Sequence, residues 1–287
     1  MARDAGPPAS PRSWVLLCCT RARGRQYAGR GAGVATFVIV HGGWSGAWEW
    51  RAFAPLLQAA GHEVLRTTLT GLGERAHLAS PAVSLDTHVH DVVNVLVYED
   101  LRDVILVGHS YGGAVVTGAA ERVPERLAHL VFVDAFVPED GQAVVDLLGP
   151  EVTADWRERV RTLGDGWRLP SPFPGATARH APAPWKPVEE PLAVRDPAAA
   201  ALPRTYIHCT AKPNPDAPVY AHFRDVAARA PARGWRLREL PTGHLPMRSA
   251  PQALADLLLE VPVAGDRERP EPGGTPPDAR PTPEGAA

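Results

Sequence analysis

Two kinds of hydrophobic pattern alternate along the middle of the chain. Continuous runs of β-branched and other apolar residues, such as TFVIV at 36–40 and VILV at 104–107, are typical of strands covered on both faces. Between such runs, 85–98 repeats apolar residues at the spacing of an amphipathic helix, with Ser84 as a candidate N-cap. Strands that alternate with helices predict an α/β fold, with a mostly parallel sheet and helices on both of its faces. The patterns place strands at 36–40, 63–68, 104–107, 130–133, 205–209 and 235–240, and helices at 51–60, 85–98, 111–122, 142–148 and 251–261.

The two ends of the chain lack this pattern. Residues 1–34 hold six Arg with scattered Gly and Pro, and 264–287 is rich in Pro with almost no apolar side chains. Too few apolar groups are present there to offset the entropy lost on ordering. We therefore predict a disordered leader at 1–34, one domain at 35–263 and a disordered tail at 264–287.

One internal segment also breaks the alternation. Residues 149–203 are rich in Pro and Ala, yet they carry large apolar side chains. We predict that this insertion forms a small lid above the carboxyl ends of the strands, where open α/β sheets bind ligands. Its large aromatic residues are Trp156, Trp167, Phe173 and Trp185.

Composition narrows the function without identifying it. The chain has 287 residues, of which 45% are hydrophobic and 22% charged, as in soluble globular proteins. The net charge of −2 gives no electrostatic reason to expect binding to nucleic acid or to an anionic membrane, so we predict neither as a partner. No apolar run approaches the roughly 18 residues that span a bilayer. The three cysteines, two of them adjacent at Cys18 and Cys19, favour a reducing compartment over a disulfide scaffold, so we expect a cytoplasmic protein.

The strongest chemical motif is Gly108-His109-Ser110-Tyr111-Gly112, which follows the VILV strand and precedes an apolar helix. A G-x-S-x-G sequence in this context is typical of a tight strand-to-helix turn that exposes the serine hydroxyl above the sheet. The helix that begins there directs its N-terminus at developing negative charge. Ser110 is therefore the candidate nucleophile, and His109 a candidate residue of the substrate pocket.

A second motif, HGGW at 41–44, directly follows the 36–40 strand. Acyl transfer to a serine needs two backbone N–H donors for the oxyanion. We expect these donors from Gly43 and from Tyr111, the residue after the nucleophile. Trp44 is a candidate residue of the acyl pocket. A plain glycine turn is the alternative interpretation of HGGW.

The candidate general base is His244, in Thr242-Gly243-His244 between the last predicted strand and helix. This position puts it at the same edge of the sheet as Ser110. Of the eleven histidines, we expect His88 and His90 on a helix surface. Pairs such as His88/His90 and His41/His62 lack a third ligand at useful spacing, so we predict no metal site.

The order HGGW, GHSYGG and a late GH resembles the α/β-hydrolase family. Residues 36–262 are similar to its small methylesterase and hydroxynitrile-lyase branch, the salicylate-esterase type, through FVIVHGGWSGAWEW, APLLQAAGHEV, VILVGHSYGG and LVFVDAFVPEDG. The resemblance implies a single-domain enzyme without a cofactor that cleaves small esters of aromatic or hormone-like acids. Lyase members have Thr and Lys where this chain has Gly42 and Leu245, so hydrolysis is favoured over cyanohydrin cleavage.

The resemblance also leaves the acid of the triad open. The branch places an Asp in a C-T-x-D pattern, whereas this chain reads Cys209-Thr210-Ala211-Lys212. Two other carboxylates remain. Asp134 ends the 130–133 strand and would need a partner in so apolar a run, and Asp216 lies in a Pro-rich loop that could fold back. We favour Asp134, although it could instead be a structural carboxylate that caps backbone N–H groups.

The sequence thus predicts a serine hydrolase that cleaves small, fairly apolar carboxylic esters through a Ser-His-Asp triad and an acyl-enzyme. A biosynthetic tailoring enzyme that hydrolyses lactones or thioesters or cyclises an intermediate, and a non-catalytic small-molecule binder, are the alternatives. The sequence predicts no oligomeric state.

Overall fold

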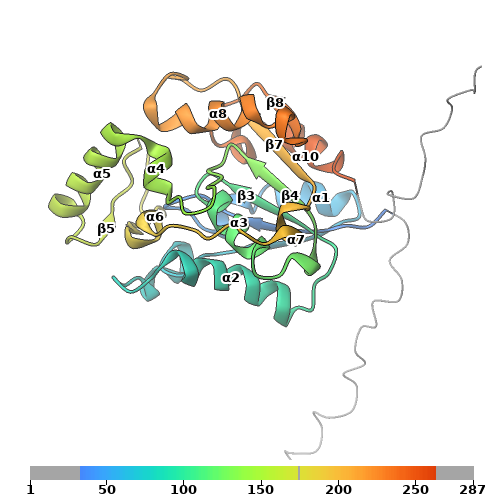
Figure 1. The fold of residues 1–287 in the computed structure, drawn as a ribbon, viewed down its shortest axis with the longest axis horizontal. Helices are drawn as coiled ribbons and strands as arrows, with labels where there is room; N and C mark the ends of the chain where they lie inside the picture. Colours follow the sequence, from blue (N-terminus) through green and yellow to red (C-terminus); the bar gives the residue numbers. More distant parts are fainter. Residues whose placement is uncertain (1–32, 174, 263–287) are drawn as a thin grey trace, which may run out of the picture. The chain divides into compact units, whose positions relative to one another are not determined.

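The computed structural model describes residues 33–173 and 175–262. The predictions made for 1–34 and 264–287 lie outside these residues, except at 33 and 34. A six-stranded sheet forms the centre of the described part, in the order β2-β1-β3-β4-β7-β8, and every neighbouring pair is parallel (Figure 1). Its strands are β1 (Thr36–Val40), β2 (Glu63–Thr67), β3 (Val104–His109), β4 (Leu127–Val133), β7 (Arg204–Cys209) and β8 (Arg236–Leu240).

Helices cover both faces of this sheet, because successive side chains of each buried strand point to opposite sides. Val38 and Leu106 belong to one hydrophobic core, and their neighbours Phe37 and Ile105 belong to the other. The predicted mostly parallel sheet with helices on both faces is confirmed. The first core includes α2 (Leu85–Tyr98), α3 (Gly112–Ala120) and α8 (Ala221–Arg229), and the second includes α1 (Ala54–Ala59) and α10 (Pro251–Leu259).

The chain changes direction across the sheet at β1. It continues from β1 to β2 on one side and then returns to β3 on the other side. The turns that follow β1 and β3 therefore diverge, which leaves a crevice at the carboxyl ends of these two strands. Both glycine-rich motifs lie in those turns.

The segment that follows β4 holds short helices and two short strands joined by irregular stretches. Figure 1 shows α4, α5, β5 and α6 gathered beyond one end of the sheet. Within 149–203, α5 is the longest element. The bounds are α4 (Val144–Leu148), α5 (Pro150–Leu163), β5 (Arg168–Leu169), β6 (Ala183–Pro184), α6 (Lys186–Glu189) and α7 (Pro197–Ala200).

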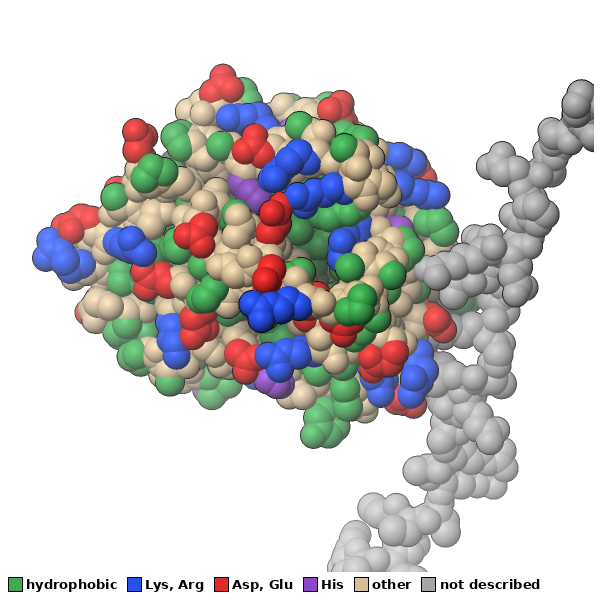
Figure 2. Space-filling model, viewed as in Figure 1, with side chains coloured by type: hydrophobic (Ala, Val, Ile, Leu, Met, Phe, Trp, Pro, Cys, Tyr) green, Lys and Arg blue, Asp and Glu red, His purple; other side chains and the backbone are tan. Residues whose placement is uncertain are grey.

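Short elements complete the described part. They are α9 (Pro246–Ser249) and the 3₁₀ turns Ala47–Trp50, Gly73–Leu78, Pro124–Arg126, Pro218–Tyr220 and Pro231–Arg233. Figure 2 shows basic and acidic side chains interspersed over the face in view. No helix among residues 33–173 and 175–262 has the length and apolar character needed to cross a membrane.

The predicted helix at 85–98 coincides with α2. Ser84 caps it by accepting a hydrogen bond from the Thr87 backbone N–H, and the Thr87 hydroxyl accepts one from the Ser84 N–H in return. This reciprocal capping satisfies two N–H groups that the helix leaves free.

Candidate active site

Ser110 lies in the turn between β3 and α3 with a φ of 52°. This left-handed conformation is rare for a residue with a side chain and is kept only where the surroundings enforce it. A Cβ at Gly108 would lie 2.7 Å from the Gly112 carbonyl oxygen, and a Cβ at Gly112 would lie 2.7 Å from the carbonyl oxygens of Val40 and His41. The two flanking glycines are therefore required by the close approach of the backbone.

His244 lies between Ser110 and Asp134 and is within hydrogen-bond distance of both. Its Nδ1 is 2.6 Å from Asp134 Oδ2, and its Nε2 is 3.0 Å from Ser110 Oγ. Because a carboxylate only accepts, Nδ1–H donates to Asp134, which leaves Nε2 to accept the Ser110 hydroxyl proton. Three turns far apart in the sequence, after β3, β4 and β8, thus meet at one edge of the sheet.

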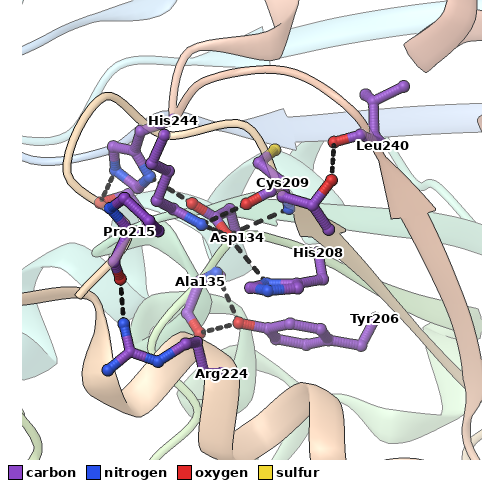
Figure 3. A network of polar contacts seen from close by, with 12 residues as sticks. Asp134, Ala135, Tyr206, His208, Cys209, Pro215, Arg224, Leu240 and His244 are labelled. Atoms are coloured by element: carbon purple, nitrogen blue, oxygen red, sulfur yellow. Dashed lines mark hydrogen bonds and ion pairs between the residues drawn. The ribbon is translucent and has the colours of Figure 1, made fainter.

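Asp134 is fully buried, with 0% of its surface exposed, and polar groups converge on it from β7 (Figure 3). The Cys209 N–H donates to its Oδ1 at 3.2 Å, and His208 Nδ1 lies 3.4 Å from the same oxygen. Burial by itself raises the pKa of Asp134, but the contacts with His208 and His244 and the charge of Lys212 outweigh burial and hold this pKa well below its usual range. The carboxylate therefore stays ionised.

Asp216, the other candidate acid, is not brought to this site. Its side chain is 92% exposed and lies 4.0 Å from the Arg224 guanidinium.

The His244 ring is held in place from two further sides. Phe223 stacks on it with ring centres 5.3 Å apart and planes within 7°. His109 Nε2 donates to the His244 carbonyl oxygen at 2.7 Å. Burial lowers the pKa of His109 to about 3, so this imidazole stays neutral. His109 lines the wider of two pockets beside Ser110, although its ring is buried.

Gly43 and Tyr111, the predicted oxyanion donors, both line the narrower of the two pockets beside Ser110. Among the hydrogen bonds of the described residues, neither backbone N–H has an acceptor. His41 Nδ1 donates to the Gly42 carbonyl oxygen at 2.7 Å, while its Nε2 accepts from the Leu69 N–H at 3.1 Å. Since a trans peptide directs its C=O and N–H to opposite sides, His41 directs the Gly43 N–H away from itself. This orienting role of His41 was missed in the sequence.

An apolar cavity lies beside Ser110, under the segment 149–203. Trp44 connects the two regions, since its Nε1 donates to the Leu169 carbonyl oxygen at 2.7 Å and its ring packs on Trp156 at 5.3 Å. Of the aromatic residues predicted for the insertion, Trp156, Phe173 and Trp185 line this cavity and Trp167 does not.

The prediction that His88 lies on a helix surface is wrong. His88 is 1% exposed and lines the cavity, where its Nδ1 is 2.8 Å from the Tyr111 hydroxyl. It lies three residues after Leu85 and four before Val92, both of which are buried, so the helical spacing already placed it on the apolar face. Within the part of the chain that the structure describes, no three His, Cys, Asp or Glu residues are grouped as a metal site.

Comparisons with known proteins agree with this fold. The model of the alpha/beta hydrolase family matches residues 37–257, so the chain belongs to this family. A carbendazim hydrolyzing esterase from Nocardioides sp. (strain SG-4G) is 37% identical over 79% of this chain and 100% of its own length. Putative methylesterase 15 from Arabidopsis thaliana is 28% identical over 80% of this chain but only 57% of its own length.

A solved structure is also similar. It is an extracellular alpha/beta-hydrolase from a Paenibacillus species, described as sharing structural and functional homology with tobacco salicylic acid binding protein 2. Its TM-score is 0.65 at 26% identity, over 78% of this chain and 98% of that one. The predicted family and branch are confirmed, and the chain is an esterase-type alpha/beta hydrolase, that is, a carboxylic ester hydrolase.

Proposed function

We propose that this protein hydrolyses small, fairly apolar carboxylic esters through a covalent acyl-enzyme on Ser110. The observation that carries the proposal is the continuous hydrogen-bonded series from Ser110 Oγ through His244 to Asp134, at the mouth of an apolar cavity. Nucleophile, base and orienting acid in this arrangement are the requirements of acyl transfer.

In the proposed reaction, Ser110 Oγ attacks the ester carbonyl carbon while His244 Nε2 takes the hydroxyl proton. The N–H groups of Gly43 and Tyr111 donate to the oxyanion, and Asp134 stabilises the imidazolium. Collapse of the tetrahedral intermediate breaks the bond to the alcohol oxygen, which receives the proton from Nε2. Water, activated by the same imidazole, then releases the acid and restores Ser110.

The cavity supports an apolar acyl group. Its walls include the rings of Trp44, Trp156 and Phe173, and we propose that the segment 149–203 acts as a lid that excludes water from the acyl-enzyme. The wider pocket beside it is also lined by His244, together with His109, Arg248 and Leu245, and we propose that the alcohol leaves through it. A cytoplasmic location is also proposed, in keeping with the three cysteines of the sequence, two of them adjacent.

Stopped-flow hydrolysis of p-nitrophenyl acetate tests the mechanism. We expect a burst of about one p-nitrophenolate per wild-type chain and none from the Ser110→Ala variant. Carbendazim, the compound in the name of the bacterial relative, serves as a second test substrate. If the wild type shows neither burst nor turnover while a ligand screen finds tight binding, the protein is a small-molecule binder. Cyclic product instead of free acid would indicate a tailoring enzyme.

A further inference from the structure

A buried lysine lies next to the proposed triad. Lys212 is 6% exposed, and its Nζ donates to Asp134 Oδ1 at 2.8 Å and to the Cys209 carbonyl oxygen. Its ammonium also lies 5.3 Å from the Tyr220 ring centre and 5.8 Å from that of Phe223, the ring that stacks on His244. A lysine is rarely buried without a paired charge, and this one stands where the resemblance led us to expect a carboxylate.

The two oxygens of Asp134 have different partners. Oδ1 accepts from Lys212 Nζ and the Cys209 N–H, whereas Oδ2 faces His244 Nδ1. Rotation of the carboxylate would break the contacts on Oδ1. The lysine therefore fixes the oxygen that His244 does not use, and this presents the other oxygen to the imidazole.

The charge of Lys212 acts on the same pair. In the proposed reaction His244 gains a proton, and the negative charge of Asp134 stabilises the resulting cation. The positive charge of Lys212, on the far side of the carboxylate, offsets part of that attraction.

We propose that Lys212 is a positioning residue of this site, which fixes Asp134 against His244 and keeps the base neutral at lower pH. This inference rests on the proposed function. The other titratable neighbours are His208, Cys209 and Tyr206 on β7, Tyr220 beside α8 and His109 on β3. Burial raises the pKa of Tyr206, Tyr220 and Cys209 and lowers that of His109 to about 3, so these four keep one charge state near neutral pH.

The test compares Lys212→Met with Lys212→Arg, both measured per folded molecule. For Lys212→Met we expect the acid midpoint of kcat/KM to rise by about one pH unit and the plateau kcat to fall about 10-fold with little change in KM. Lys212→Arg keeps the charge and should return the midpoint to the wild-type value. A lysine that only stabilises the fold would lower the melting temperature and leave midpoint and plateau unchanged, which would overturn the proposal.

A second measurement does not depend on turnover. The midpoint of the His244 ring titration, followed by NMR, should also rise in Lys212→Met. This rise should persist when His208→Asn is added to both proteins. If Lys212→Met fails to fold, the single variant Asp134→Asn is compared with the double variant Asp134→Asn/Lys212→Met. The double variant leaves no buried carboxylate without a partner. The His244 midpoint should be higher in the double variant, and equal midpoints overturn the proposal.

The two measurements separate the two proposals. An NMR shift in a protein that does not hydrolyse the test esters would retain the role of Lys212 and reject the proposed reaction at Ser110. Ester turnover with unchanged midpoints in Lys212→Met would retain the proposed reaction and reject the role of Lys212.

Discussion

The turns at the carboxyl ends of the strands and the segment 149–203 face the same cavity but are built differently. The turns hold Ser110, His244 and Asp134 by short hydrogen bonds, and both Ser110 and Asp134 have positive φ. The segment instead presents rings such as Trp156 and Phe173, which pack edge to face. We therefore expect reactivity to depend on the rigid polar geometry of the turns, and the choice of substrate to depend on the apolar shape of the cavity.

The largest effect should come from Ser110→Ala on the side of the turns. With the nucleophile removed, kcat should fall by at least about 10⁵-fold, and by a similar factor for small and for bulky esters. Steady-state rates with p-nitrophenyl acetate and p-nitrophenyl benzoate measure this. If kcat fell for only one of the two esters, the turns would not act on both substrates alike, which would contradict this prediction.

The next effect distinguishes the two candidate acids. Asp134→Asn should lower kcat about 10⁴-fold, because an amide cannot stabilise the imidazolium and favours the wrong tautomer. Asp216→Asn is the matched control, since its side chain is exposed and bonded only to Arg224 in the described structure. It should change kcat by less than about 2-fold. The opposite order would remove Asp134 from the triad.

Acid sensitivity should come from four buried imidazoles outside the segment 149–203, namely His41, His88, His109 and His222, because burial lowers the pKa of each. Burial lowers the pKa of His109 to about 3 and those of His88 and His222 to about 4. In the unfolded chain these groups take up protons near pH 6.5, so folded stability is fully present above that pH and is lost as the pH falls toward 4. From His88, His109 and His222 alone, we expect the folding equilibrium constant to fall about 10³-fold for each pH unit between about 6 and 4, near 4 kcal/mol, and His41 adds to this.

Urea unfolding at a series of pH values measures that slope. His222→Gln removes one of these groups, so the fall in the folding equilibrium constant for each pH unit should be about 10-fold smaller than in the wild type. An unchanged slope would show that His222 does not contribute to acid unfolding.

The sequence predicted the turns better than the cavity. Runs such as 36–40 and 104–107 predict the strands, and G-x-S-x-G between a strand and a helix is typical of a tight turn that exposes the serine. The sequence shows Lys212 at the place of the missing carboxylate, but its contact with Asp134 joins positions 78 residues apart, which no local pattern predicts. The predicted bounds of the helix at 85–98 agree with the structure, but the prediction left His88 out of the buried face of this helix.

The smallest effect tests the segment 149–203. Trp156→Leu keeps an apolar side chain but removes the ring that packs on Trp44 and Phe173 in the cavity wall. Leu163→Ala, 63% exposed on the same helix, is the matched control. We expect Trp156→Leu to raise KM for p-nitrophenyl benzoate about 10-fold, as when contacts worth 1–3 kcal/mol are lost from an apolar pocket, and to change KM for the acetate by less than about 2-fold.

That result depends on the two esters having the same leaving group, so that only the acyl part differs. If Trp156 shapes the acyl site, kcat stays nearly constant and the discrimination between the two esters falls. If instead the wall positions the turns through Trp44, kcat falls for both esters alike. The second outcome would mean that the hydrogen bond from Trp44 to Leu169 makes the lid part of the catalytic geometry, and the division between the two regions would then fail at that residue.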